Sequence, residues 1–150
     1  MKFNRIFIAL LLLVVASSIA IACAEEVTVA DHEFTIPDGY SILNNTDDSV
    51  ILTQDDDHVI VVYVPEEVRN SDDAKAFLED IGYKFIDEES YTADGKDVQQ
   101  QNYEKDGYTV MSYVIPAGAD QCIVTFTIPA DETAPEGADN PVTTILNSIS

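Results

Sequence analysis

The residues best suited to chemistry in this chain form one short segment, Asp55-Asp56-Asp57-His58. Three carboxylates and an imidazole are all ligands that a divalent cation accepts. Neighbouring side chains alternate in direction along an extended segment, so Asp55 and Asp57 can converge while Asp56 points away. Oxygen ligands suit calcium or manganese, and His58 shifts the choice towards manganese or zinc. We therefore predict metal ligands at Asp55, Asp57 and His58. The alternative is a solvated turn in an acidic protein.

The sequence lacks the usual catalytic patterns. His32-Glu33 begins like a zinc-protease motif, but Ile36 stands where the second histidine belongs, and the segment precedes a strand instead of lying on a helix. The chain has no Gly-x-Ser-x-Gly elbow, no glycine-rich phosphate loop and no Cys-x-x-Cys. We therefore predict that the protein is not an enzyme and has no cofactor, apart from a possible calcium or manganese ion.

Charge narrows the range of partners. The 150 residues include 28 Asp and Glu against 7 Lys and Arg, which gives a net charge of −21. Such an acidic chain repels the phosphates of nucleic acids and of anionic lipids, so we exclude both as partners. Hydrophobic residues make up 46% of the chain, which is enough to build one core.

The first 24 residues have the pattern of a secretory signal peptide. Lys2 and Arg5 precede an apolar run, Ile6–Ile21, and Ala22-Cys23-Ala24 offers a small-x-small cleavage site. This pattern predicts a signal peptide over 1–24 and a single acidic domain over 25–150. The mature protein is then extracellular or on the outer face of a prokaryotic cytoplasmic membrane, and it touches the membrane only through its N-terminal segment. An uncleaved anchor is the alternative.

Two residues are candidates for modification after export. Cys23 can be lipidated, as in prokaryotic lipoproteins, although Ala20 stands where that pattern usually has leucine. Asn44 opens the glycosylation sequon Asn44-Asn45-Thr46.

Apolar runs and turn residues predict an antiparallel meander with two helices. Val50–Thr53 and Val59–Val64 read as a hairpin around the acidic turn. Other strands are expected at Val27–Val29, Phe34–Ile36, Tyr83–Ile86, Glu89–Thr92, Val98–Tyr103, Tyr108–Ile115 and Gln121–Ile128. One amphipathic helix is expected from its cap Ser71 to Gly82, and another from Pro141 with Asn140 as its cap. The predicted class is α+β, with both helices packed on the sheet.

One predicted strand is unusually polar. Val98–Asn102 carries polar side chains on both faces, which is typical of an edge strand. With its neighbouring tyrosines it predicts an interaction surface formed by Tyr91, Gln99, Gln101 and Tyr103. The alternative is a solvated hairpin whose tyrosines partly cover the core. By contrast, Cys122 lies in an apolar strand and is expected to be a buried thiol.

Two short motifs resemble a known family. Phe34-Thr35-Ile36-Pro37-Asp38-Gly39-Tyr40 resembles the opening of Mog1/PsbP-like domains, in which a strand enters the sheet and Pro-x-Gly turns it. Ile145-Leu146-Asn147-Ser148-Ile149 resembles their closing helix. The resemblance covers Val27 to Ser150 and implies a Mog1/PsbP-like layered domain. It implies no site residue, because functions in that superfamily are diverse.

Taken together, these features predict an exported, highly acidic, non-catalytic binding domain at the cell surface or envelope. Its expected partners are an envelope protein, a wall polymer or a divalent ion. One alternative is a divalent-metal-binding surface protein that uses the Asp55–His58 turn. Others are a solvating surface protein, whose acidity is itself the function, and an envelope hydrolase.

Overall fold

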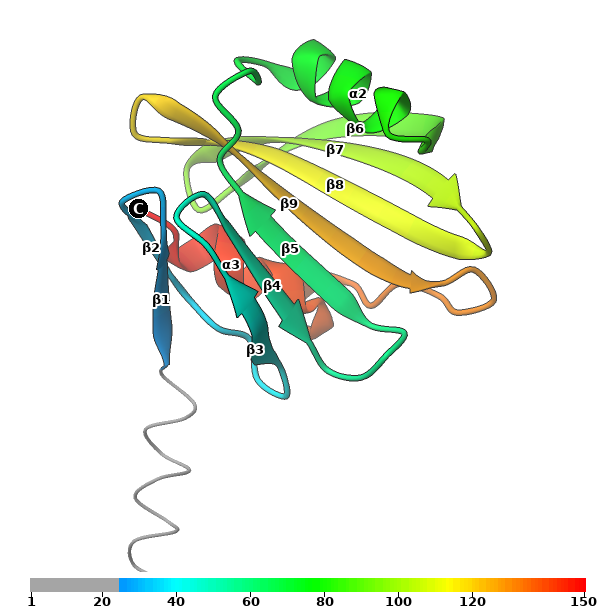
Figure 1. Ribbon diagram of the computed structural model, residues 1–150, viewed down its shortest axis with the longest axis horizontal. Helices are drawn as coiled ribbons and strands as arrows, with labels where there is room; N and C mark the ends of the chain where they lie inside the picture. The colour runs from blue at the N-terminus through cyan, green and yellow to red at the C-terminus, as the bar shows by residue number, and fades with distance from the viewer. Residues whose placement is uncertain (1–24) are drawn as a thin grey trace, which may run out of the picture.

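A computed structural model describes residues 25–150, so the predicted signal peptide and Cys23 lie outside the described residues. The described residues form nine strands and two α-helices (Figure 1). The strands are β1 (Glu26–Val29), β2 (His32–Thr35), β3 (Ser41–Asn45), β4 (Ser49–Thr53), β5 (Val59–Tyr63), β6 (Lys84–Ala93), β7 (Lys96–Lys105), β8 (Tyr108–Ala117) and β9 (Asp120–Pro129). The helices are α2 (Ser71–Asp80) and α3 (Pro141–Ser148), and a short 3-10 helix, η1 (Gly137–Asp139), precedes α3.

Seven strands form one antiparallel sheet in the order β3-β4-β5-β9-β8-β7-β6. The fold is therefore α+β, as the sequence predicts. The predicted hairpin around the acidic turn is also confirmed, because β4 and β5 pair in register from Ser49 opposite Tyr63 to Thr53 opposite Val59. β1 and β2 form a separate two-stranded hairpin.

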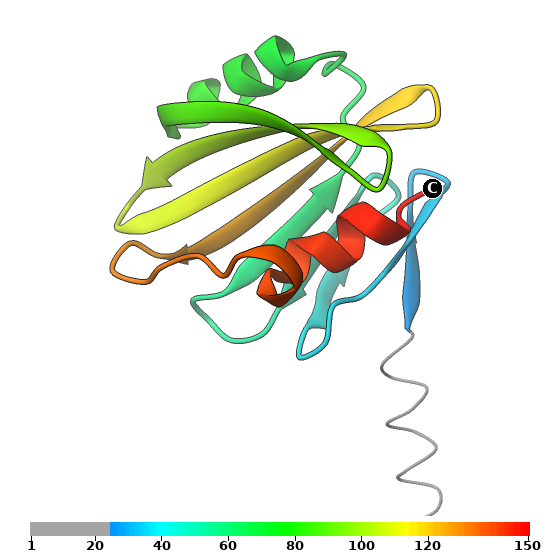
Figure 2. The ribbon, with the colours of Figure 1, turned by 180° about the vertical axis from the view of Figure 1, so that it is seen from behind.

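The two faces of the sheet pack against different helices. α3 and the β1–β2 hairpin cover one face, where Ile145 joins the larger core (Figure 2). α2 covers part of the other face, where Ala74 packs with Val114 and Ile123. Side chains alternate along a strand, so β8 and β9 supply buried residues to both faces. Cys122 lies in the larger core, as predicted.

Both helices begin at a side-chain cap. The Asn70 side chain accepts a hydrogen bond from the backbone N–H of Asp73, so the cap of α2 is Asn70 and not the predicted Ser71, which is the first helical residue. Asn140 caps α3 and is followed by Pro141, as predicted. Gly82 follows the C-cap residue Ile81 of α2 with φ of +98°, a left-handed conformation that favours glycine.

Two strand predictions are corrected by the structure. The segments expected as separate strands at Tyr83–Ile86 and Glu89–Thr92 belong to one continuous strand, β6. The polar segment Val98–Asn102 lies in β7, which pairs with β6 on one side and β8 on the other, so it is not an edge strand. Its polarity has another cause, because Gln101 is buried beneath α2 and bonds to that helix.

The few basic residues are concentrated in one part of the chain. From residue 25 onward, every Lys and Arg lies between Arg69 and Lys105. This segment comprises α2, β6 and β7 with their connections, so the β3–β4–β5 side of the sheet carries none. None of the helices in residues 25–150 is long and apolar enough to cross a membrane.

Candidate functional site

A groove of about 1240 Å³ lies between α2 and the sheet. In α2, Ala74 packs against β8 and β9 and Leu78 packs against β7 and β8, while the contact with β5 is made by Phe77 at Tyr63. Ile51, Val61 and Tyr63 on the same face of the sheet are only half-buried. The turns β1–β2, β3–β4 and β8–β9 close one end of the groove.

Apolar and acidic side chains line different parts of this groove. Val61, Tyr63 and Phe77 form an apolar floor, with the rings of Tyr63 and Phe77 6.0 Å apart between centroids. Burial raises the pKa of Tyr63, so its hydroxyl stays neutral. Five carboxylates and one guanidinium complete the lining: Asp47, Asp48, Glu66, Glu67, Asp120 and Arg69. The groove is thus both apolar and strongly negative.

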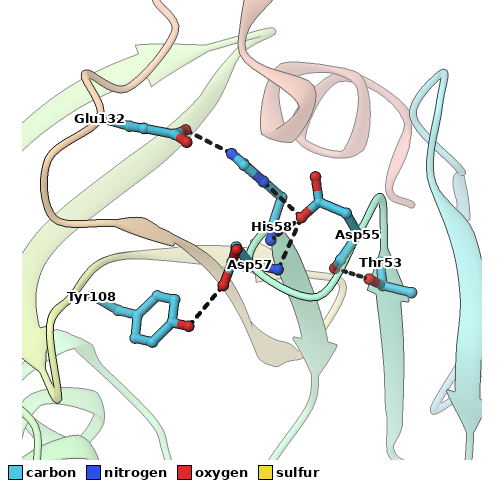
Figure 3. A network of polar contacts seen from close by, with 6 residues as sticks. All are labelled: Thr53, Asp55, Asp57, His58, Tyr108 and Glu132. Carbon is cyan, nitrogen blue, oxygen red and sulfur yellow. Dashed lines mark hydrogen bonds and ion pairs between the residues drawn. The ribbon is translucent and has the colours of Figure 1, made fainter.

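The acidic turn predicted from sequence lies beside a second, smaller pocket of about 280 Å³. His58 joins two carboxylates there (Figure 3). Its Nδ1 lies 2.8 Å from Asp55 Oδ1, and its Nε2 lies 2.6 Å from Glu132 Oε2. An imidazolium can donate from both nitrogens at once, so the arrangement favours the charged form.

The protonation of these groups follows from the contacts. Hydrogen bonds to Asp55 and then Glu132 raise the pKa of His58. The hydrogen bond from His58, with a second from the backbone N–H of Asp57, lowers the pKa of Asp55. The turn 54–58 is therefore tied to the loop that follows β9 by a charged bridge.

The structure brings together two of the three predicted metal ligands. Asp55 and His58 are in contact, whereas the Asp57 carboxylate accepts a hydrogen bond of 2.8 Å from the Tyr108 hydroxyl (Figure 3). Sequence reasoning missed Glu132, which lies 74 residues from His58 along the chain and carries no local signal. Among residues 25–150, no group of three or more His, Cys, Asp or Glu residues is arranged to hold a metal ion. The metal site stays a prediction.

The predicted interaction surface is wrong for two of its four residues. Gln101 and Tyr103 are fully buried, and they bond to each other through the Tyr103 hydroxyl at 2.9 Å. Gln101 also donates to the backbone oxygen of Ser71 in α2, at 2.9 Å. Tyr91 is exposed and Gln99 is half-buried, with its amide oxygen accepting from Ser90. The buried pair therefore anchors α2 to the sheet.

Three other residues singled out by sequence have clear environments. Burial raises the pKa of the Cys122 thiol to about 12, so it is not a nucleophile at neutral pH. Asn44 is exposed on β3, and its glycosylation stays a prediction. His32 lies 3.0 Å from Asp120 through Nε2 and 2.7 Å from the backbone oxygen of Ser150 through Nδ1.

Comparisons with known proteins support the fold alone. A crystal structure from Bacteroides thetaiotaomicron VPI-5482, determined at 1.50 Å resolution, is similar with a TM-score of 0.54 and 10% sequence identity. The similarity covers 85% of this chain and 48% of that one, so the present chain spans about half of its structural neighbour. No protein-family model matches the chain. No curated protein matches it either.

Proposed function

We propose that the protein is an exported, highly acidic, non-catalytic binding domain whose ligand occupies the groove between α2 and β5. The groove itself is the observation that carries this proposal, because α2 leaves an apolar strip of the sheet incompletely covered. Large concave surfaces that combine apolar and polar groups are typical of binding sites. The partner is an envelope protein or a wall polymer, met at the cell surface after removal of residues 1–24.

The state of the reactive side chains supports binding over catalysis. Both ring nitrogens of His32 and of His58 already contact oxygen atoms of the protein, so neither ring offers a free nitrogen as a general base. The Cys122 thiol is buried and protonated. An envelope hydrolase remains the less favoured prediction, and turnover of simple ester, phosphate or glycoside substrates would restore it.

We also infer a Mog1/PsbP-like layered domain. The support is the order of elements along the chain, in which a hairpin, a helix, a meander and a closing helix follow the Phe34–Tyr40 motif. One feature departs from that pattern: β2, which carries the start of the motif, pairs with β1 and not with the seven-stranded sheet. A crystal structure of a clear Mog1/PsbP-like homologue with its opening strand paired in the same way would strengthen the inference.

Site-directed photocrosslinking in the producing cells tests the proposed binding site. A photoreactive p-benzoylphenylalanine replaces Val61 in the groove, and the matched control carries it at Glu89 on β6. We expect one discrete adduct from position 61, identified by mass spectrometry as a protein or a wall polymer, and none from position 89. No adduct at position 61, or the same products from both positions, would refute the proposal.

A second candidate, a divalent-metal-binding surface protein, comes from the sequence prediction at Asp55, Asp57 and His58, of which the structure brings Asp55 and His58 into contact. A metal there must displace a proton from His58. The test is thermal unfolding with calcium, manganese, zinc or EDTA at matched ionic strength. A metal present at 100 times its Kd should raise the free energy of unfolding by about 2.7 kcal/mol. A metal site is supported if one metal raises the unfolding temperature of the wild type and the double variant Asp55→Asn, Asp57→Asn loses this rise. The metal site is refuted if the wild type and the double variant respond equally to all the cations.

A further inference from the structure

The size of the groove indicates what kind of ligand it takes. Small-molecule pockets in proteins span about 300–1,000 Å³. The groove between α2 and β5 exceeds this range at about 1240 Å³. A segment of a polymer therefore fits it better than a small metabolite. This reasoning rests on the proposed function, in which the groove is the binding site.

The protein neutralises the charge of the groove only in part, because Arg69 is the one cation among the residues of 25–150 that line it, against five carboxylates. Asp47, Asp48, Glu66 and Glu67 are exposed around it. The lysines of the described chain are occupied elsewhere. Lys75 lies 3.8 Å from the centroid of the Phe85 ring, and Lys105 donates to the backbone oxygen of Ile81. Lys84 pairs with Glu104, and Lys96 donates to the backbone oxygen of Leu146. A cationic ligand would supply the charge that the groove lacks.

The apolar part of the groove favours a ligand that also carries apolar groups. Ile81 follows α2 and keeps 49% of its surface exposed. It lines the groove together with the half-buried rings of Tyr63, Phe77 and Tyr83. Acidic side chains gather at the turns and apolar ones along α2, so the ligand needs both positive charge and apolar side chains.

We propose that the groove binds a basic amphipathic peptide segment of a partner protein. Lysine or arginine side chains of that segment meet Asp47, Asp48, Glu66 and Glu67, and its apolar side chains cover Ile81 and the aromatic floor. Exposed charges of this kind mainly raise the association rate and make binding sensitive to salt. The buried apolar contacts hold the segment in place.

The probe is a fluorescein-labelled synthetic 14-residue peptide with lysine and leucine at helical spacing, titrated with the protein purified after export from its producing cells. Three comparison ligands are used: the peptide with serine in place of leucine, the peptide with glutamate in place of lysine, and spermine. We expect saturable binding of the amphipathic cationic peptide that weakens as sodium chloride rises from 50 to 500 mM. The comparison ligands should bind at least tenfold more weakly.

Matched variants locate the site. Neutralising Asp47, Asp48, Glu66 and Glu67 to their amides should weaken binding about tenfold, because each exposed pair contributes little alone. The control neutralises the same number of exposed acids away from the groove: Glu89, Asp97, Asp131 and Glu136. It should change binding less than twofold.

A second matched pair tests the apolar contact without removing charge. Ile81→Gln should weaken binding several-fold, whereas Ile86→Gln should not, although Ile86 is exposed to the same degree, at 48%. Circular dichroism confirms that each variant is folded. Equal binding of the serine peptide, or equal effects of groove and control variants, overturns the proposal. No binding of any peptide also overturns the ligand class, while an adduct from position 61 would still support the groove as the binding site.

Discussion

His58 makes a prediction that can be worked through in detail, because it is bonded to two carboxylates and the chain contains only one other histidine. The perturbation is His58→Gln, which keeps a polar side chain of similar length and removes the titratable ring. The variant cannot carry the positive charge that joins Asp55 to Glu132. We expect it to lose a defined, pH-dependent part of the free energy of unfolding.

The sign of the effect follows from the raised pKa. His58 binds its proton more tightly in the folded protein than in the unfolded chain. Its contribution to stability is therefore complete below the unfolded value of about 6.5 and disappears as the pH rises through the folded pKa. Asp55, whose pKa is lowered, behaves in the opposite way, and its contribution disappears as the pH falls through its own folded pKa.

The magnitude is modest because the carboxylates are about half exposed. Ion pairs of this kind contribute roughly 0.2–1 kcal/mol each, so the two together contribute about 1 kcal/mol. The free energy of unfolding of the wild-type protein should fall by about that amount between pH 6 and pH 9, because His58 loses its proton. His32, whose pKa is raised by Asp120, should add a smaller loss of the same sign through its single carboxylate partner.

The assay is urea unfolding at pH 6 and pH 9, followed by far-ultraviolet circular dichroism, for wild type, His58→Gln, His32→Gln and the double variant. His58→Gln should lose most of the pH dependence, His32→Gln should keep most of it, and the double variant should have almost none. The reasoning fails if His58→Gln follows the wild-type curve, or if the double variant keeps the full dependence.

Three further predictions concern the supports of the site. Gln101→Met should lower the free energy of unfolding by about 2 kcal/mol, because it leaves the buried Tyr103 hydroxyl unpaired. Adding Tyr103→Phe should lower it little further. Additive losses of the two substitutions in urea unfolding would contradict the hydrogen bond between these residues. Asn70→Ala should lower the free energy of unfolding by about 1 kcal/mol, and Ser71→Ala should lower it much less, as measured by thermal unfolding. Equal losses in the two variants would show that Asn70 is not the N-cap of α2. Cys122 should react with a thiol reagent only at the rate of unfolding, and a fast reaction in native buffer would show that the thiol is accessible.

The elements that the sequence predicted well are those with local signals. The β4–β5 hairpin follows from two apolar runs around an acidic turn. α3 follows from Asn140 and Pro141 at its start, and the burial of Cys122 follows from the apolar alternation of its strand. Each of these signals lies within a few residues of the structure that it predicts.

The features that could not be predicted depend on residues far apart in the chain. Glu132 reaches His58 only because β5 and β9 are neighbours in the sheet. Gln101 looks like a surface residue until α2 covers it and Ser71 accepts its amide hydrogen bond. The groove is likewise a result of where α2 ends on the sheet, which no local pattern determines.

The uneven placement of basic residues has a consequence for how the molecule approaches a surface. The β3–β4–β5 side carries acidic turns and no Lys or Arg, whereas the cations all lie between Arg69 and Lys105, on the α2, β6 and β7 side. The segment 69–105 is still acidic overall, with ten Asp and Glu against five Lys and Arg, but it is less negative than the rest of the domain, so we expect an electric dipole that runs across the strands. Near a positively charged surface we expect the molecule to turn its β3, β4 and β5 side towards that surface.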